Sequence, residues 1–180
     1  DGSPTPATEK VYAQLMGTNV TARQRLDLCA YLLAMETEFR RAHRQYAGVL
    51  HLGYLTCSVP GAYTGDNFSD VTRLKLDPAF ADYMGEAFKP LGVYLNFLQP
   101  TLAAGASREF TVMMVNDEYH PVSGTVVLSL QTENGRELAR AEQRFDMKEL
   151  GDATYRVPLT VPTGASGKCV LKATAQPDGK

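Results

Sequence analysis

The sequence has no tryptophan and only three cysteines among its 180 residues. Cys29, Cys57 and Cys169 stand too far apart for metal-ligand spacing, and an odd number of cysteines cannot all pair within one chain. We therefore expect three free and mostly buried thiols, because a free cysteine packs as a small apolar residue. Cys57 has no obvious base near it in the sequence, which argues against a cysteine nucleophile.

A basic stripe and a long apolar run are also missing. Lys and Arg number 18 against 20 Asp and Glu, with a formal net charge of −2, so we expect no nucleic-acid partner. No apolar run approaches the ~20 residues of a membrane span, and we expect no membrane partner. The first residues lack signal-peptide character and an initiator Met. They resemble a surface loop cut out of a longer chain, although a processed or engineered start would look the same.

The pattern of apolar residues changes halfway along the chain. Residues 1–92 have the periodicity of helices plus one strand, whereas residues 93–175 have the periodicity of strands only. We therefore place a domain boundary between residues 92 and 93. The composition, 44% hydrophobic and 21% charged, is that of a globular protein long enough for one large or two small domains.

Capping signals define the helices of the first half. A short helix is predicted over residues 11–16, and Thr21 with Gln24 forms a capping box that opens a long helix to about residue 45. The predicted apolar face of this helix is formed by Leu26, Leu28, Ala30, Leu32, Leu33, Met35, Thr37, Phe39 and Ala42. A face this broad is expected to pack on a sheet or on other helices. Asp77-Pro78 predicts the start of a further helix, because Asp is a favoured N-cap and Pro suits the first helical position. Its predicted buried face is formed by Phe80, Tyr83, Met84, Ala87 and Phe88.

Between these helices lie an apolar run and a long polar loop. Residues 48–56 are predicted to form a strand buried on both faces, as in parallel sheets, but the chain offers no second strand of this kind. The loop 57–76 that follows is rich in Gly and polar residues. Loops of this length within compact domains are usually functional or disordered.

The second half predicts six or seven short strands with turns between them, which favours an immunoglobulin-like β-sandwich, with an open barrel as the alternative. Asn134-Gly135 predicts a type I′ hairpin turn. The predicted core residues are Val112, Met114, Val126, Leu128, Leu130, Leu159, Val170 and Leu171. Leu171 is the exception in this set, because it would face away from the adjacent Val170 in a regular strand.

The order of these elements, together with several short motifs, resembles glycoside hydrolases of family 2, the β-galactosidase-like kind. The segment "FRRAHRQYAGVLHLGYL" resembles the helix that leads into the last barrel strand of that family. Lys89-Pro90 resembles the end of the closing helix, and Val115-Asn116-Asp117 and Gly124-Thr125-Val126 resemble two sandwich strands. The resemblance covers most of residues 20–175. It implies a mixed fold, with residues 1–92 as the end of a (β/α)₈ barrel and residues 93–180 as an immunoglobulin-like sandwich.

The resemblance implies a parent enzyme, a glycosidase of carbohydrate metabolism, that works with an acid/base and a nucleophilic carboxylate on earlier strands. Residues 44–60 contain no carboxylate, so this chain alone is expected to lack the catalytic pair. Family members place a Trp near the position of Leu52, and its absence here implies a different sugar platform. The sequence names no compartment, although a secreted or periplasmic parent agrees with the resemblance.

Four residues at the expected barrel rim are the candidates for sugar contact in the intact parent: Tyr54, Tyr63, Asp66 and Asn67. Tyr63 could stack on a sugar ring, while Asp66 and Asn67 could bond its hydroxyls. Asp66 and Asp70 could also form a carboxylate pair, but an Asx-turn or solvated role is favoured. We expect no metal and no cofactor, because the three histidines have no ligand spacing. The implied partners are the remainder of the barrel, carbohydrate and a second copy of the chain.

Two other classes of protein compete with this interpretation. The chain could be a free-standing binding or adhesion module, in which a helical layer packs on the sandwich. It could also be a small enzyme that uses the loop together with His51, Cys57 or His120, although no G-x-S-x-G motif appears. Self-association would distinguish an incomplete barrel from a free-standing module, because an incomplete barrel exposes apolar surface.

Overall fold

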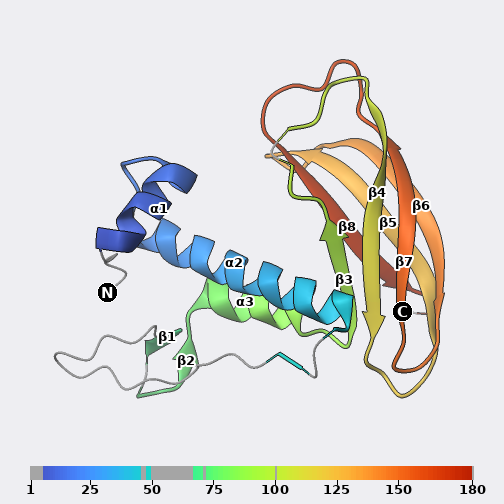
Figure 1. Ribbon diagram of the computed structural model, residues 1–180, viewed down its shortest axis with the longest axis horizontal. Helices are drawn as coiled ribbons and strands as arrows, with labels where there is room; N and C mark the ends of the chain where they lie inside the picture. Colours follow the sequence, from blue (N-terminus) through green and yellow to red (C-terminus); the bar gives the residue numbers. More distant parts are fainter. Residues whose placement is uncertain (1–5, 46–47, 50–66, 71, 100, 180) are drawn as a thin grey trace. The chain divides into compact units, whose positions relative to one another are not determined.

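A computed structural model describes residues 6–45, 48–49, 67–70, 72–99 and 101–179 (Figure 1). The chain divides into two compact units, each of which we describe separately. The first comprises Asp1–Thr37 and Gly48–Phe88, and we call it the helical unit. The second comprises Glu38–Ala47 and Lys89–Lys180, and we call it the sheet unit. Helix α2 contributes its last turns to the sheet unit. The fold is mixed, with helices and small antiparallel sheets in its described part.

The helical unit contains α1 (Pro6–Met16), most of α2 (Ala22–His43), α3 (Pro78–Ala87) and a short antiparallel pair, β1 (Phe68–Asp70) with β2 (Lys75–Leu76). Both predicted capping motifs are confirmed. The N–H of Thr21 donates to Gln24 Oε1 at 2.9 Å, and the N–H of Gln24 donates to Thr21 Oγ1 at 3.2 Å. Asp77 Oδ1 accepts from the N–H groups of Ala79 and Phe80.

The core of the helical unit is small and is formed by Ala30 and Ala34 of α2 with Phe80, Met84 and Ala87 of α3. The buried stripe of α2 is also narrower than predicted. Leu26 and Leu32 of α2 were expected to be buried but are more than a third exposed. Tyr83 and Phe88 were likewise expected on the buried face and are 41% and 46% exposed. A hydrophobic stripe shows which side chains can be buried, but the neighbouring elements decide which ones are.

Two further expectations for this half concern the strand and the loop. Residues 50–56 of the predicted strand lie outside the described residues, and Gly48 and Val49 have no regular secondary structure. Within the described part of the predicted loop 57–76, β1 and β2 pair with each other. The expected burial of cysteine is wrong where it can be examined, because Cys29 and Cys169 are both exposed. Cys57 lies outside the described residues.

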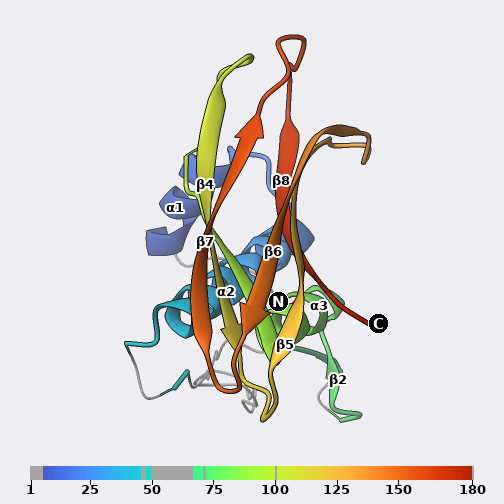
Figure 2. The same ribbon diagram turned by 90° about the vertical axis from the view of Figure 1, so that its right-hand side faces the viewer.

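The sheet unit contains six strands in two three-stranded antiparallel sheets. Their bounds are β3 (Leu91–Asn96), β4 (Ser107–Asn116), β5 (Val122–Thr132), β6 (Glu137–Met147), β7 (Asp152–Thr160) and β8 (Cys169–Pro177). One sheet has the order β3-β4-β7 and the other β6-β5-β8. Strands β6 and β7 of the two sheets lie side by side (Figure 2).

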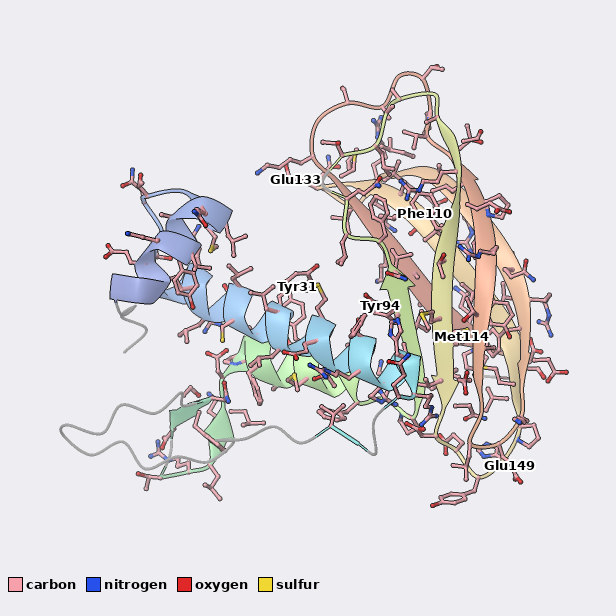
Figure 3. The ribbon with its side chains drawn as sticks, viewed as in Figure 1. Tyr31, Tyr94, Phe110, Met114, Glu133 and Glu149 are labelled. Atoms are coloured by element: carbon pink, nitrogen blue, oxygen red, sulfur yellow. The ribbon has the colours of Figure 1, made fainter. Side chains whose placement is uncertain are left out.

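One hydrophobic core joins the two sheets. Phe110, Val112 and Met114 of β4 are buried together with Val126, Leu128 and Leu130 of β5, and Phe110 and Met114 are labelled in Figure 3. The predicted core positions Val112, Met114, Val126, Leu128, Leu130 and Leu159 are confirmed, and Phe110 is buried with them. The prediction that Val170 lies in the core is wrong, because its side chain is 49% exposed. Leu171 pairs with Leu130 and packs against the core, and its neighbour must therefore face outward.

The predicted type I′ turn between β5 and β6 is also wrong. Such a turn needs a positive φ at both central residues, but within this turn only Gly135 has one, at 82°. The N–H of Gly135 donates to the carbonyl of Thr132, and the register shifts between Leu130 and Gln131. This combination is a longer turn with glycine in the left-handed conformation followed by a bulge. The Asn-Gly pair predicted the hairpin correctly but not the length of its loop.

Gly124 lies where two strands and a ring approach closely, and this generates a prediction. A Cβ atom there would lie 2.3 Å from the carbonyl oxygen of Gln176 and 2.7 Å from the ring of Phe145. Since the carbonyl belongs to the backbone of β8, Gly124→Ala must move a strand. We expect a loss of stability of about 1–3 kcal/mol or more, measured as a shift of the urea midpoint.

Gly164→Ala is the matched control, because a Cβ atom at Gly164 has nothing within 4 Å. This variant should unfold within about 0.5 kcal/mol of the wild type. Equal midpoints for the Gly124 and Gly164 variants would contradict the close approach of β5 and β8.

Candidate functional site

The last turn of α2 packs on the outward side of β3 within the sheet unit. Phe39 and His43 lie one turn apart, with ring centroids 4.1 Å from each other. Both rings approach Tyr94 of β3, at 5.9 Å and 6.0 Å, and Tyr94 is buried (Figure 3). Arg44 follows the helix with a φ of 48°, a left-handed conformation that ends α2. The chain is thereby turned while the side chains of Arg41 and Arg44 stay near the sheet.

Both arginines bind Asp117, which lies directly after β4. Arg41 Nη2 donates to Asp117 Oδ2 at 2.7 Å, and Arg44 Nη2 donates to Asp117 Oδ1 at 2.6 Å. Arg41 Nη2 also donates to the carbonyl of Lys89 at 2.8 Å. Gly92 leaves room for this guanidinium, because a Cβ atom there would lie 3.3 Å from Arg41 Nη1. Each carboxylate oxygen of Asp117 therefore has its own arginine.

Asn116, the residue before Asp117, is fully buried and holds two loops with its side chain. Its Nδ2 donates to the carbonyls of His120 and Lys148, both at 2.9 Å, and its Oδ1 accepts from the N–H of Glu118 at 3.0 Å. Its own N–H donates to the carbonyl of Gly151 at 2.8 Å. We call Arg41, Arg44, Asn116 and Asp117 the Asn116–Asp117 joint. The joint fastens the β4–β5 and β6–β7 loops and the end of α2 to one another.

Electrostatics keep Asp117 ionised. Burial alone would raise the pKa of this carboxyl, but the hydrogen bonds and charges of Arg41 and Arg44 outweigh burial, so the pKa is lowered. A general acid needs a raised pKa to hold its proton near neutral pH. Asp117 is therefore suited to binding the two arginines and unsuited to donating a proton.

Two other carboxyl groups in the described part of the chain have a lowered pKa for the same kind of reason. Hydrogen bonds from Arg23 lower the pKa of Asp77, which also caps α3. A hydrogen bond from Arg144 lowers the pKa of Asp178. Asp70 accepts from the N–H of Arg73 at 3.0 Å and pairs with its side chain at 2.9 Å, which is the turn role favoured by the sequence.

The predicted sugar-contact residues are mostly beyond what the structure describes. Tyr54, Tyr63 and Asp66 lie outside the described residues. Asn67 is partly buried, and its carbonyl accepts from the N–H of Asp77 at 2.8 Å. The set of four stays a prediction. Among the described residues, no group of three or more His, Cys, Asp or Glu could hold a metal, and no helix is long and apolar enough to cross a membrane.

Sequence reasoning did not identify the joint, although one signal for it exists. Alternation along β4 places Phe110, Val112 and Met114 inward, and the next inward position is Asn116. A polar side chain that continues a buried face must find hydrogen-bond partners, so Asn116 could have been predicted to organise nearby loops. No local pattern pairs Asp117 with Arg41, because they are separated by 76 residues.

Comparisons with known proteins find similar solved structures, among them two glycosidases. No protein-family model and no curated protein matches the chain. The chain is similar to a β-glucuronidase from glycoside hydrolase family 2 at 11% identity and a TM-score of 0.32. It is also similar to a putative β-galactosidase from Bacteroides fragilis at 20% identity and a TM-score of 0.30. Both matches cover 48% of this chain but only 11% and 15% of those chains. They carry no argument about activity.

The joint generates a prediction about pH. A lowered folded-state pKa means that Asp117 stabilises the fold at pH values above its unfolded pKa, about 3.9. This contribution is lost as the pH falls through the lower, folded pKa. Asp117→Asn should therefore lower stability at pH 7 by about 1 kcal/mol, a modest value because the pair is partly exposed. The variant should also lose less stability than the wild type on acidification toward pH 3.

Thermal unfolding at several pH values measures this difference. Asp152→Asn is the control, because Asp152 is exposed and forms no ion pair with another described residue. If Asp117→Asn and the wild type have parallel pH profiles, the two arginines do not stabilise the ionised carboxyl.

Proposed function

We propose that this chain is a non-catalytic C-terminal segment of a β-galactosidase-like glycoside hydrolase. In this proposal residues 1–92 close a (β/α)₈ barrel, and residues 93–180 supply an accessory immunoglobulin-like β-sandwich. The observation that carries the proposal is the Asn116–Asp117 joint. Its Asn-Asp pair belongs to the Val115-Asn116-Asp117 motif of the resemblance. The carboxylate of Asp117 binds two arginines and the amide of Asn116 binds loop backbone, which suits a structural role.

The architecture of the sheet unit supports the sandwich part of the proposal. Two three-stranded antiparallel sheets share one core, as the two layers of a sandwich do. Gly124, which belongs to the second sandwich motif of the resemblance, lies at a close approach of backbone and ring. Both motifs of the sheet unit therefore have structural reasons for their residue types.

The helical unit supports the barrel part of the proposal through its exposed apolar side chains. Single exposed apolar residues are ordinary, but many on a small unit indicate a surface that another element covers. Among the described residues, the exposed large apolar side chains of α1, α2 and α3 in this unit are Val11, Leu15, Met16, Leu26, Tyr31, Leu32 and Tyr83. Tyr31 and Tyr83 come from different helices, and their rings pack edge to face at 5.8 Å. We propose the remainder of the parent barrel as the covering partner.

Self-association of the purified chain tests this proposal against the free-standing module. We expect sedimentation velocity to show concentration-dependent association, because the exposed helix faces are hydrophobic. A Tyr31→Lys, Leu32→Lys variant should reduce the association. Leu98→Lys is the control, because Leu98 is 71% exposed in the sheet unit. A wild-type chain that stays monomeric over a wide range of concentration would favour the free-standing module.

Enzyme assays test the non-catalytic part. Hydrolysis needs two carboxyl groups about 5–5.5 Å apart for retention or about 6.5–9.5 Å apart for inversion. Among the described residues, the carboxyl groups whose pKa is shifted are Asp77, Asp117 and Asp178, and each is bound by arginine and has a lowered pKa. We expect no turnover of aryl α- or β-glycosides by the purified chain. Turnover that disappears in Asp66→Asn or Asp70→Asn would contradict the proposal.

A further inference from the structure

The β4–β5 loop presents one aromatic side chain to solvent on a fixed backbone. Tyr119 is 84% exposed, and the buried side chain of Asn116 bonds the residue on either side of it. Asn116 Oδ1 accepts from the N–H of Glu118, and Asn116 Nδ2 donates to the carbonyl of His120. The apex of the loop is therefore held from inside while the tyrosine ring stays outside. A fully exposed ring on a held backbone is ready to bind with little loss of conformational entropy.

The β6–β7 turn meets this loop and adds an exposed leucine. The N–H of Leu150 donates to the carbonyl of Glu118 at 3.1 Å, which joins the two loops next to Tyr119. Leu150 is 54% exposed and has a φ of 49°, an uncommon conformation for a residue with a side chain. A Cβ atom at Gly151 would lie 2.8 Å from Lys148 Cγ, so the turn is also tightly closed. We call residues 117–121 and 148–151 the Tyr119 tip; Glu149 marks its place in Figure 3.

The tip carries charges of both signs. Its carboxylates are Asp117, Glu118 and Glu149 and its ammonium group is that of Lys148, while Arg41 and Arg44 from the end of α2 pair with Asp117. Glu149 and Lys148 are exposed. Within the described part of the chain, their side chains form no hydrogen bond or ion pair. Hydrogen-bond donors and acceptors are thus both available on the two loops that meet beside Tyr119.

These features favour one kind of ligand. A strongly acidic or basic partner meets like charges as well as opposite charges on such a surface. A protein interface buries about 800 Å² on each side, and the apolar part of the tip consists of only two exposed side chains. A pyranose has an apolar C–H face that suits an aromatic ring and hydroxyls that both donate and accept. The tip offers complementary groups, an exposed aromatic ring with carboxylates and an ammonium group on the same two loops.

We propose that the Tyr119 tip binds neutral saccharide chains, with a sugar ring stacked on Tyr119 and its hydroxyls bonded by Glu118, Lys148 and Glu149. This site lies on the sheet unit and includes none of the four residues predicted at the barrel rim. One ring gives a weak site, with a dissociation constant of about 1 mM, and repeated units along a polymer raise the apparent affinity. The inference rests on the geometry of the tip, so it can fail while the proposed function holds. The proposed function can likewise fail while the tip binds saccharide.

Affinity electrophoresis of the whole chain tests the inference, with native gels containing hydroxyethylcellulose, xyloglucan, galactomannan or mixed-linkage β-glucan. We expect at least one polymer to retard the wild type. Tyr119→Ala should weaken the retardation about tenfold or more, which corresponds to about 1.4 kcal/mol. Tyr119→Phe should retain most of it, because the ring remains. Tyr83→Ala is the matched control, because Tyr83 is an exposed tyrosine of the helical unit.

Salt provides a second readout, because binding of a neutral ligand should change little when sodium chloride is raised to 0.5 M, whereas ionic binding would fall steeply (screening length about 4–5 Å). Equal melting temperatures for wild type and Tyr119→Ala would show that the loss is not unfolding. The proposal is overturned if no polymer retards the wild type, or if Tyr119→Ala is retarded as strongly as the wild type. It is also overturned if Tyr119→Ala abolishes self-association while no polymer binds, since the tip would then be a protein contact.

Discussion

Two adjacent side chains at the end of β4 connect two loops of the sheet unit with the end of α2. Asn116 is buried and uses its amide on two loops, while Asp117 is bound by two arginines from the end of α2. The two roles depend on each other, because Asn116 fixes the backbone that aims the carboxylate of Asp117. A buried amide without partners would cost about 1–3 kcal/mol, so the loops must stay where the amide can bond them.

The proposed function depends on the charges of this joint. Arginine on both oxygens lowers the pKa of Asp117 and removes it from proton transfer. The same loops that the joint fastens carry Tyr119 outward on a held backbone. An ordered joint with an exposed ring beside it suits the structural and binding roles proposed above. Catalysis would require a pair of carboxyl groups with opposed pKa shifts.

Local signals predicted the local structure well. The capping box at Thr21 and the N-cap Asp77 both form the bonds expected from their sequence. Strand alternation correctly placed Val112, Met114 and Leu128 in the core. Such signals succeed because each depends on residues within a few positions or on the two-residue period of a strand.

Features that depend on distant neighbours could not be predicted in the same way. Leu32 belongs to an apolar stripe, yet its exposure is decided by what covers α2. Val170 and Leu171 are equally apolar, and only the pairing of Leu171 with Leu130 shows which one faces the core. The turn at Gly135 depends on the register of β5 and β6 as well as on the Asn-Gly pair. The joint requires residues 76 positions apart, and three of the four predicted sugar-contact residues lie outside the described chain.

The central claim is that Asn116 holds both loops as one unit, and native-state hydrogen exchange of Asn116→Ala tests it most directly. The amide protons of Asp117, Glu118 and Leu150 donate to Pro90, Asn116 and Glu118 respectively. We predict that all three exchange at least about tenfold faster in the variant. The Gly105 amide, which donates to Val161, should keep its wild-type rate. Faster exchange at Glu118 alone, with Asp117 and Leu150 unchanged, would show that Asn116 bonds the loops without holding them together.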